Sequence, residues 1–310
     1  MKPLEVRGLT IEYLTHRGWA EVVSEVDLDI NERNEILAIV GESGCGKTTL
    51  GLAIAGLLPP NARKVHGYVK VFGKDVNSNF NSVKVSMIFQ DALTSLNPLL
   101  TVGEQIAEIY VHHFGMNKKE AFEEAKKRLN EVGLPASYMN KYPHELSGGQ
   151  RQRVLIAMAI ALKPELIVAD EPTTALDVTT QAMVLNLLKS IVKSKSIPMV
   201  YITHDLALVA HIADKVAVMY AGQVVEYCEK HTLFKDPKHP YTQALLSSLP
   251  RVDTELSELQ TIRGEPPLPG SFPKGCRFSP RCPKAFSMCF AEKPAIKGVG
   301  SGYVRCHLYG

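Results

Sequence analysis

The chain has 310 residues, a formal net charge of +3 at pH 7 and 45% hydrophobic residues, values typical of a globular protein of one or two domains. The small charge excludes the strongly basic footprint of a nucleic-acid-binding protein, so we expect no nucleic-acid partner. The start, MKPLEVRGLTIEY, lacks the apolar core of a signal peptide, and the apolar runs are too short to cross a bilayer. Any contact with a membrane is therefore expected to go through partner proteins.

Strand and helix patterns alternate along most of the chain. Partial alternation and short buried runs predict strands at residues 4–14, 21–30, 35–40, 67–76, 85–90, 165–172, 199–205 and 215–227. Helical patterns fall at residues 48–58, before Pro59 and Pro60, at 118–134 and at 179–194. This order predicts an α/β protein with a mostly parallel sheet that is covered on both faces.

A change of composition near Pro250 predicts a domain boundary. Residues 1–250 carry the alternating pattern, with a mostly helical segment at about 92–162. Residues 251–310 contain the Pro- and Gly-rich stretch GEPPLPGSFPKG and four of the six cysteines. We therefore expect one large domain followed by a small Cys-rich C-terminal extension.

The sequence GESGCGKT at 41–48 fits the phosphate-loop pattern G-x-x-x-x-G-K-[ST], with a buried strand before it and a helix after it. Its backbone N–H groups would surround phosphate oxygens at a helix N-terminus. Lys47 would neutralise the β- and γ-phosphates, and the Thr48 hydroxyl would ligate Mg²⁺. The residues expected to bind the nucleotide here are Gly41, Glu42, Ser43, Gly44, Cys45, Gly46, Lys47, Thr48 and Thr49.

Two adjacent acids follow the buried strand ELIVADEP. Asp170 would emerge at the carboxyl end of this strand, beside the phosphate loop, where a carboxylate can hold Mg²⁺ directly or through a water. Glu171 can orient or deprotonate the attacking water. Adjacent acids at a strand end are otherwise commonly solvated, but the phosphate loop favours the functional interpretation.

A second glycine turn, LSGGQ at 146–150, also opens onto a helix. A nucleotide bound at Lys47 already has one phosphate-binding turn and does not need a second. The LSGGQ turn is therefore expected to contact a nucleotide that is bound to another subunit. At these residues the sequence resembles the ATP-binding cassette (ABC) family, whose LSGGQ signature clamps ATP on the opposite subunit's phosphate loop. The resemblance implies a head-to-tail dimer that closes on ATP and opens after hydrolysis. The residues implied to contact the partner's ATP are Ser147, Gly148, Gly149 and Gln150.

Four further positions match the family pattern. Gln90 matches the glutamine that contacts Mg²⁺ and the attacking water, and Asp177, in TALD, matches the loop that crosses the dimer interface. His204 matches the histidine that contacts the γ-phosphate. Tyr13 is the candidate for stacking on adenine, with a core position as the alternative. The implied fold is a P-loop NTPase of the RecA-like type, with an antiparallel β subdomain, a helical signature subdomain and the extension.

The resemblance covers nearly the whole chain and points to one branch. MIFQDALTSLNPLLTVGEQI, HPYTQALLSSLP and GSFPKGCRFSPRCP look like the ATPase subunits of oligopeptide and dipeptide importers. VADEPTTALDV and MYAGQVVEY look more like the D-type subunit than its F-type companion. This implies a peripheral subunit at the cytoplasmic face of the cell membrane. Its implied partners are an F-type ATPase or a second copy, two transmembrane permeases and, indirectly, an extracellular substrate-binding protein.

Two positions depart from the family pattern. Asn34 stands where the family usually has glycine in a turn, but asparagine tolerates left-handed backbone. Cys45 replaces a common serine in the phosphate loop. Because this loop acts through backbone amides, we expect binding to hold, and we expect the thiol to be partly exposed and open to oxidation.

The cysteines of the extension have the spacing C-x5-C-x6-C-x16-C. They are Cys276, Cys282, Cys289 and Cys306. Four thiolates could hold zinc or an iron–sulfur cluster, and the lack of a C-x-x-C knuckle argues against zinc. The resemblance favours a [4Fe–4S] cluster over zinc or free thiols. The basic residues Arg277, Arg281 and Lys284 could offset thiolate charge or form a solvated loop.

Two alternatives to peptide import are open at this point. Related ATPases serve importers of oligosaccharides or nickel, and specificity lies in other subunits. An ABC protein that acts on DNA or ribosomes belongs to a different class. It usually needs a coiled-coil insertion, a zinc insertion or a second cassette, and the sequence contains none of these.

Overall fold

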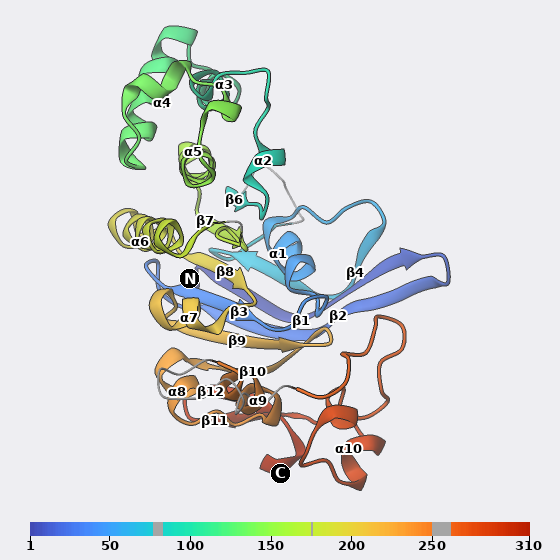
Figure 1. The fold of residues 1–310 in the computed structure, drawn as a ribbon. Helices are drawn as coiled ribbons and strands as arrows, with labels where there is room; N and C mark the ends of the chain where they lie inside the picture. Colours follow the sequence, from blue (N-terminus) through green and yellow to red (C-terminus); the bar gives the residue numbers. More distant parts are fainter. Residues whose placement is uncertain (77–82, 175, 250–261) are drawn as a thin grey trace.

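The computed structural model describes residues 1–76, 83–174, 176–249 and 262–310 (Figure 1). A four-stranded antiparallel sheet has the order β2-β1-β4-β5. Its strands are β1 (Leu4–Thr15), β2 (Gly18–Ile30), β4 (Ala62–Val71) and β5 (Lys74–Asp75). The predicted antiparallel β subdomain is therefore present at the N-terminal side of the chain.

The main sheet has eight strands in the order β11-β12-β10-β9-β3-β8-β7-β6. These strands are β3 (Ile36–Val40), β6 (Val85–Ile88), β7 (Leu166–Asp170), β8 (Met199–Thr203), β9 (Lys215–Tyr220), β10 (Gln223–Glu229), β11 (Ile296–Val299) and β12 (Gly302–Arg305). The run from β6 to β9 is parallel, and β10, β12 and β11 continue it as antiparallel strands. The prediction of a mostly parallel sheet is confirmed for its central part.

Helices surround the main sheet and build a separate lobe (Figure 1). The lobe contains α2 (Ala92–Ser95), α3 (Val102–Phe114), α4 (Lys118–Glu131), η1 (Ala136–Asn140), η2 (Pro143–Glu145) and α5 (Gly148–Ala161). The other helices are α1 (Lys47–Ala55), α6 (Val178–Lys195), α7 (Leu206–Ile212), α8 (Lys230–Lys235), α9 (Pro240–Ser247), η4 (Ser279–Arg281), α10 (Ser287–Ala291) and η5 (His307–Tyr309). The mostly helical segment predicted at 92–162 is thus α2 to α5.

The central strand β3 explains why the sheet is covered on both faces. Leu37 and Ile39 pack with α1 and the antiparallel sheet, whereas Ala38 and Val40 pack with α7 and with Phe278 of the extension. Successive side chains of a strand point to opposite faces, so a continuous apolar run buries both. The carboxyl end of β3 therefore emerges from the middle of the core.

Several predicted boundaries were wrong. The strand expected at 67–76 is β4, which already begins at Ala62, followed by the short β5. The helix expected at 48–58 ends at Ala55, because Gly56 adopts a left-handed φ of 71° and its N–H caps the helix before the prolines are reached. The strand expected at 215–227 is two antiparallel strands, β9 and β10, because Ala221 and Gly222 turn the chain with φ values of 44° and 84°.

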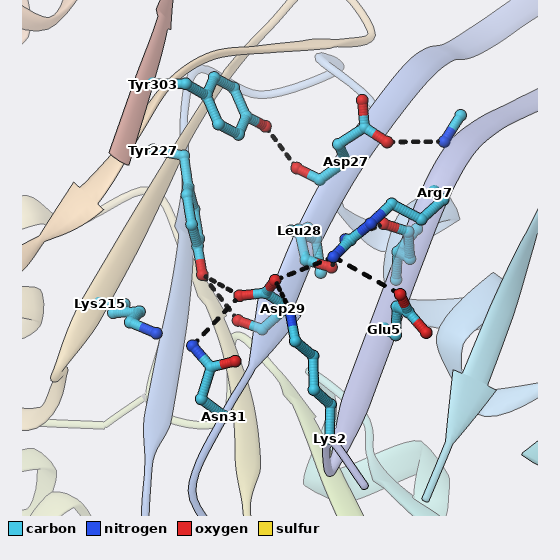
Figure 2. Close-up of polar contacts among 12 residues, drawn as sticks. Lys2, Glu5, Arg7, Asp27, Leu28, Asp29, Asn31, Lys215, Tyr227 and Tyr303 are labelled. Atoms are coloured by element: carbon cyan, nitrogen blue, oxygen red, sulfur yellow. Dashed lines mark hydrogen bonds and ion pairs between the residues drawn. The ribbon is translucent and has the colours of Figure 1, made fainter. Parts of the chain in front are cut away.

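The extension joins the main sheet. The boundary predicted at Pro250 lies outside the described residues, so the division into domains stays a prediction. After it, β12 pairs with β10, and the side chains of Tyr303 and Tyr227 on these two strands reach β2 (Figure 2). The Tyr303 hydroxyl donates to the Asp27 carbonyl, and the Tyr227 hydroxyl donates to the Asp29 carbonyl over 2.7 Å. The extension is thereby anchored to the N-terminal sheet.

Candidate nucleotide-binding site

The predicted phosphate loop connects β3 to α1, as the motif requires. Gly44 and Gly46 have φ values of 78° and 99°, a conformation that favours glycine. A Cβ on Gly46 would also lie 2.9 Å from the carbonyl oxygen of Val22 on β2. The pattern of glycines is therefore imposed by the left-handed backbone and by the closeness of the N-terminal sheet.

Lys47 begins α1, and its side chain folds back over the loop. Its Nζ donates to the carbonyl oxygens of Gly41 and Glu42, each over 2.9 Å, and the residue is only 6% exposed. An ammonium group held over a ring of backbone amides is suited to neutralise phosphate charge.

Asp170 ends β7 and is 4% exposed. Burial raises the pKa of its carboxyl group, with Glu171 adding to the rise, while a hydrogen bond from the Thr48 hydroxyl lowers it. Within the described residues, Oδ1 of Asp170 has no hydrogen-bond partner. An orphaned carboxylate oxygen beside a hydroxyl is a hard oxygen donor set that fits Mg²⁺.

Glu171 lies at the centre of a polar cluster. Its backbone has a left-handed φ of 45°, and its N–H donates to the Ile202 carbonyl over 2.9 Å. Oε1 lies 3.0 Å from Nδ1 of His204, and Oε2 accepts from the Thr174 hydroxyl at 3.0 Å and from Nε2 of Gln90 at 3.3 Å. Burial alone would raise the pKa of Glu171, but the bonds from His204 and Thr174 hold it below its ordinary value. The carboxylate is therefore ionised at neutral pH and can accept a proton.

One open cavity of about 420 Å³ is lined by Lys47, Glu171 and the side chains that bind Glu171. Its lining comprises Val22, Ser43, Gly44, Gly46, Lys47, Thr48, Thr49, Gln90, Glu171, Thr174 and His204. The structure thus brings the phosphate loop together with the three predicted catalytic residues. Tyr13 lies on the same hairpin as Val22 and packs against the core between the two sheets.

The signature turn lies elsewhere, at the N-terminus of α5. Ser147 and Gln150 form a reciprocal capping box, in which the Ser147 N–H donates to Oε1 of Gln150 over 3.0 Å. Ser147 and Gly148 are exposed, and Gly149 is buried against Thr180. Asp177 caps α6 by accepting the N–H of Thr180 over 3.0 Å. The turn therefore lies against Leu176 and Thr180, on either side of Asp177, and none of its own residues 146–150 lines the cavity.

Comparison with known proteins places this site in a family. The chain is 45% identical to the oligopeptide transport ATP-binding protein AppD of Bacillus subtilis, over 99% of this chain and 96% of that protein. It is 44% identical to OppD of Salmonella typhimurium, over 97% of this chain and 92% of that protein. Residues 23–174 match the family described as ABC transporter. The chain belongs to the ATP-binding cassette family of ATPases.

Two further findings agree with this assignment. Residues 225–289 of the cassette match the oligopeptide/dipeptide transporter C-terminal region. The fold resembles the dimeric, post-hydrolysis structure of the ATP-binding cassette MJ0796 bound to ADP and Pi, with a TM-score of 0.64 and 28% identity, over 73% of this chain and 98% of that chain. The family resemblance and the predicted fold class are both confirmed. In the described part of this cassette, no helix has the length and apolarity that a bilayer crossing needs.

The expectation for Cys45 was wrong. The thiol is only 3% exposed, because Gly41 and the turn after β9 close over it. Burial raises its pKa to about 11, which leaves it as an unreactive thiol at neutral pH.

The Cys-rich extension of the cassette is only partly as expected. Its four cysteines are free, and they influence one another, since burial and the three other thiols raise the pKa of Cys276 to about 11. Among the residues that the structure describes, however, no group of three or more His, Cys, Asp or Glu side chains is arranged to hold a metal ion. The thiols as arranged here do not fit a cluster, and we derive no chemical step through one.

The basic residues between the cysteines also differ from expectation. Arg277 is buried and binds Glu21 and the Ala221 carbonyl, and Arg281 binds Glu42. Both arginines have hydrogen-bond partners outside the thiol group, whereas Lys284 is exposed, as in the solvated alternative, and donates to Oε1 of Gln243 over 3.0 Å. The sequence did not indicate these contacts of the two arginines, because their partners lie more than fifty residues away. Thr174 was also missed, although a hydroxyl three residues after Glu171 is a usable signal.

Proposed function

We propose that the chain is the ATP-hydrolysing subunit that powers import of di- and oligopeptides through a membrane ABC transporter. One observation carries this proposal: the match of residues 225–289 to the oligopeptide/dipeptide transporter C-terminal region. The relatives with 41–45% identity, all bearing names of peptide-transport or peptide-import ATP-binding proteins, support it.

The proposed catalytic roles follow from the cavity. Glu171, ionised and held by hydrogen bonds, would orient the attacking water and take its proton. His204 is 3.0 Å from that carboxylate and is proposed to contact the γ-phosphate. Lys47 would neutralise phosphate charge as bonds to the leaving group lengthen.

Three groups are proposed to hold Mg²⁺: Thr48, Asp170 and Gln90. An ion held by these groups would supply positive charge that offsets the charge developing on the phosphates. The unpartnered oxygen of Asp170 supports this assignment. On the N-terminal hairpin, Tyr13 is proposed to stack on adenine.

The signature turn is proposed to act on a second subunit. Ser147, Gly148, Gly149 and Gln150 of one protomer would contact the ATP on the partner's phosphate loop, with Asp177 at the interface. The exposure of Ser147 and Gly148, at a helix N-terminus that favours anions, supports this. The second subunit would be an F-type ATPase or another copy of this chain.

The proposed assembly includes two transmembrane permeases and, indirectly, an extracellular substrate-binding protein. The cassette would lie at the cytoplasmic face of the membrane, and the peptide would never touch it. The [4Fe–4S] cluster stays a proposal for the extension alone, and it rests on four free thiols that the structure does not arrange as a metal site. Loading would require these thiols to draw together. Iron and sulfide analysis of anaerobically purified protein, with the visible absorption spectrum, tests it.

Uptake of labelled di- and oligopeptides by host cells tests the proposed function. Cells carrying the native chain are compared with cells carrying Glu171→Gln, with both proteins present at equal amounts. Loss of uptake in the variant is expected. Unchanged peptide uptake would contradict the peptide assignment, and the same assay with oligosaccharides and nickel would then test the related substrates.

A further inference from the structure

Glu42, the second residue of the phosphate loop, forms hydrogen bonds through its N–H, its carbonyl oxygen and its carboxylate. Its N–H donates to the Tyr241 hydroxyl over 3.0 Å, and its carbonyl oxygen accepts from Nζ of Lys47 over 2.9 Å. Its carboxylate is bound by both terminal nitrogens of Arg281, over 2.7 and 3.1 Å. The position of Glu42 therefore helps to decide where the ammonium of Lys47 lies.

Arg281 comes from the extension, between Cys276 and Cys282. Its side chain is only 6% exposed, and it also donates to the carbonyl oxygens of Arg263 and Ile262, over 2.9 and 3.4 Å, and to the Tyr220 hydroxyl over 3.3 Å. A buried guanidinium that binds a carboxylate with two parallel bonds fixes both distance and orientation. The side chain of Glu42 is 24% exposed, so solvent competes only partly for it.

Arg277 provides a second connection between the extension and the loop. It donates to the Ala221 carbonyl over 2.5 Å and pairs with Glu21 on β2. In the same turn, the Gly222 N–H donates to the carbonyl oxygen of Cys45 over 2.9 Å. The loop is thus held at Glu42 by Arg281 and at Cys45 through the turn that Arg277 supports.

The extension is itself anchored away from the loop, which allows it to act as a fixed support. Tyr303 donates to the Asp27 carbonyl (Figure 2), and Arg305 donates to the Glu25 carbonyl over 3.0 Å. These bonds tie β12 to β2, and the loop packs against β2 at Val22. The anchor and the loop therefore share one rigid strand.

We propose that Arg281 is a positioning residue for ATP binding: through Glu42 it holds the phosphate loop, and with it the ammonium of Lys47, in the conformation that receives the phosphates. This rests on the proposed function of the loop as the ATP site. Loss of Arg281 leaves Glu42 free to turn to solvent. Part of the free-energy cost of ordering the loop then opposes ATP binding. The cost falls on nucleotide affinity rather than on the chemistry at Glu171.

The test measures equilibrium binding of MgATP to the purified full chain by calorimetry. Arg281→Met keeps the length of the side chain and removes the charged fork, and Glu42→Gln removes the same pair from the loop side. Each is expected to weaken MgATP binding about tenfold, the order of one lost hydrogen bond to a charged group. Lys274→Met is the matched control, because Lys274 is an exposed cation of the same extension. This variant should bind MgATP with the affinity of the native chain.

The double variant separates positioning from general damage. If the two residues act through one contact, the double variant binds MgATP no more weakly than either single variant. Arg281→Lys keeps the charge but not the forked guanidinium. Its affinity for MgATP should lie between those of the native chain and Arg281→Met.

Three outcomes would overturn the proposal. Native affinity in Arg281→Met, with only a lower melting temperature, would make the pair purely structural. Additive losses of MgATP affinity in the double variant would mean that Arg281 and Glu42 act independently. If Arg281→Met does not fold, native affinity in Glu42→Gln would overturn it. Absence of MgATP binding by the native chain would instead contradict the proposed function on which this inference rests.

Discussion

The phosphate loop and the signature turn share a local design and differ in their surroundings. Each places glycines at the start of a helix, α1 in one case and α5 in the other. Around the phosphate loop, the ends of β7, β8 and β6 bring Glu171, His204 and Gln90 to one cavity. The signature turn lies against Leu176 and Thr180, and Nε2 of Gln150 donates to the Tyr138 hydroxyl over 2.9 Å.

This difference explains why one chain can carry two anion-binding turns. A helix N-terminus attracts an anion, but hydrolysis needs further groups that activate water and neutralise charge. The first turn has those groups on its own chain. The second has a capped, exposed helix end and no catalytic side chains among the described residues around it, which suits a contribution to a site on another subunit.

The largest expected effect is on Glu171. Glu171→Gln keeps the size of the side chain but cannot accept a proton, so we expect ATP hydrolysis to fall about a thousandfold. Binding of MgATP should be kept, because Lys47 and the loop are untouched. Phosphate release and calorimetric binding, measured on the same preparation, check this, and normal turnover in the variant would remove Glu171 from its role.

The next effect tests the second turn. Ser147→Arg places a bulky cation where the partner's ATP is proposed to dock, and we expect hydrolysis by the assembled transporter to fall about a hundredfold. Binding of ATP to the isolated chain should be unchanged. Loss of binding in the isolated chain would show that Ser147 serves the phosphate loop of its own subunit.

The two signature glycines should respond differently. A Cβ on Gly149 would lie 2.2 Å from Cγ2 of Thr180, whereas one on Gly148 would lie 3.2 Å from a flexible end of Leu176. We expect Gly149→Ala to lower the free energy of unfolding by about 2 kcal/mol. Gly148→Ala is the matched control and should be close to neutral. Equal effects in urea unfolding would contradict the proposed packing of this turn on α6.

The smallest expected effect is a gain of stability. Because burial raises the pKa of Asp170, its ionised form costs stability in the chain without Mg²⁺. Below the ordinary pKa, Asp170 is neutral in both the folded and the unfolded chain, and it costs the folded chain no stability. As pH rises through the raised pKa of the folded chain, the carboxyl group ionises there and stability is lost. Asp170→Asn should therefore raise the free energy of unfolding at neutral pH by about 1 kcal/mol.

Thermal melting at acidic and neutral pH checks this prediction. The gain from Asp170→Asn should shrink at acidic pH, where the native carboxyl group is already neutral, and Mg²⁺ with ATP should stabilise only the native chain. A variant less stable than the native chain at neutral pH would mean that Asp170 has a partner that compensates its charge.

Short-range patterns allowed much of this molecule to be predicted. The glycines and Lys47 of the loop, the glycine turn before α5 and the strand before Asp170 depend on neighbouring residues, whose types set backbone preference and burial. The gathering of Gln90, Glu171 and His204 was expected only from the family pattern, because three strands of the sheet bring them together.

The sequence by itself determined the local geometry of both turns and the chemical groups that the site can use. The tertiary structure decided which of these groups meet. It buried Cys45, which local sequence predicted to be exposed, and it directed Arg277 and Arg281 from the thiols to β2 and the phosphate loop. The reason is physical: burial and ion pairing depend on partners brought close by packing, and a pattern along the chain contains no distance between them.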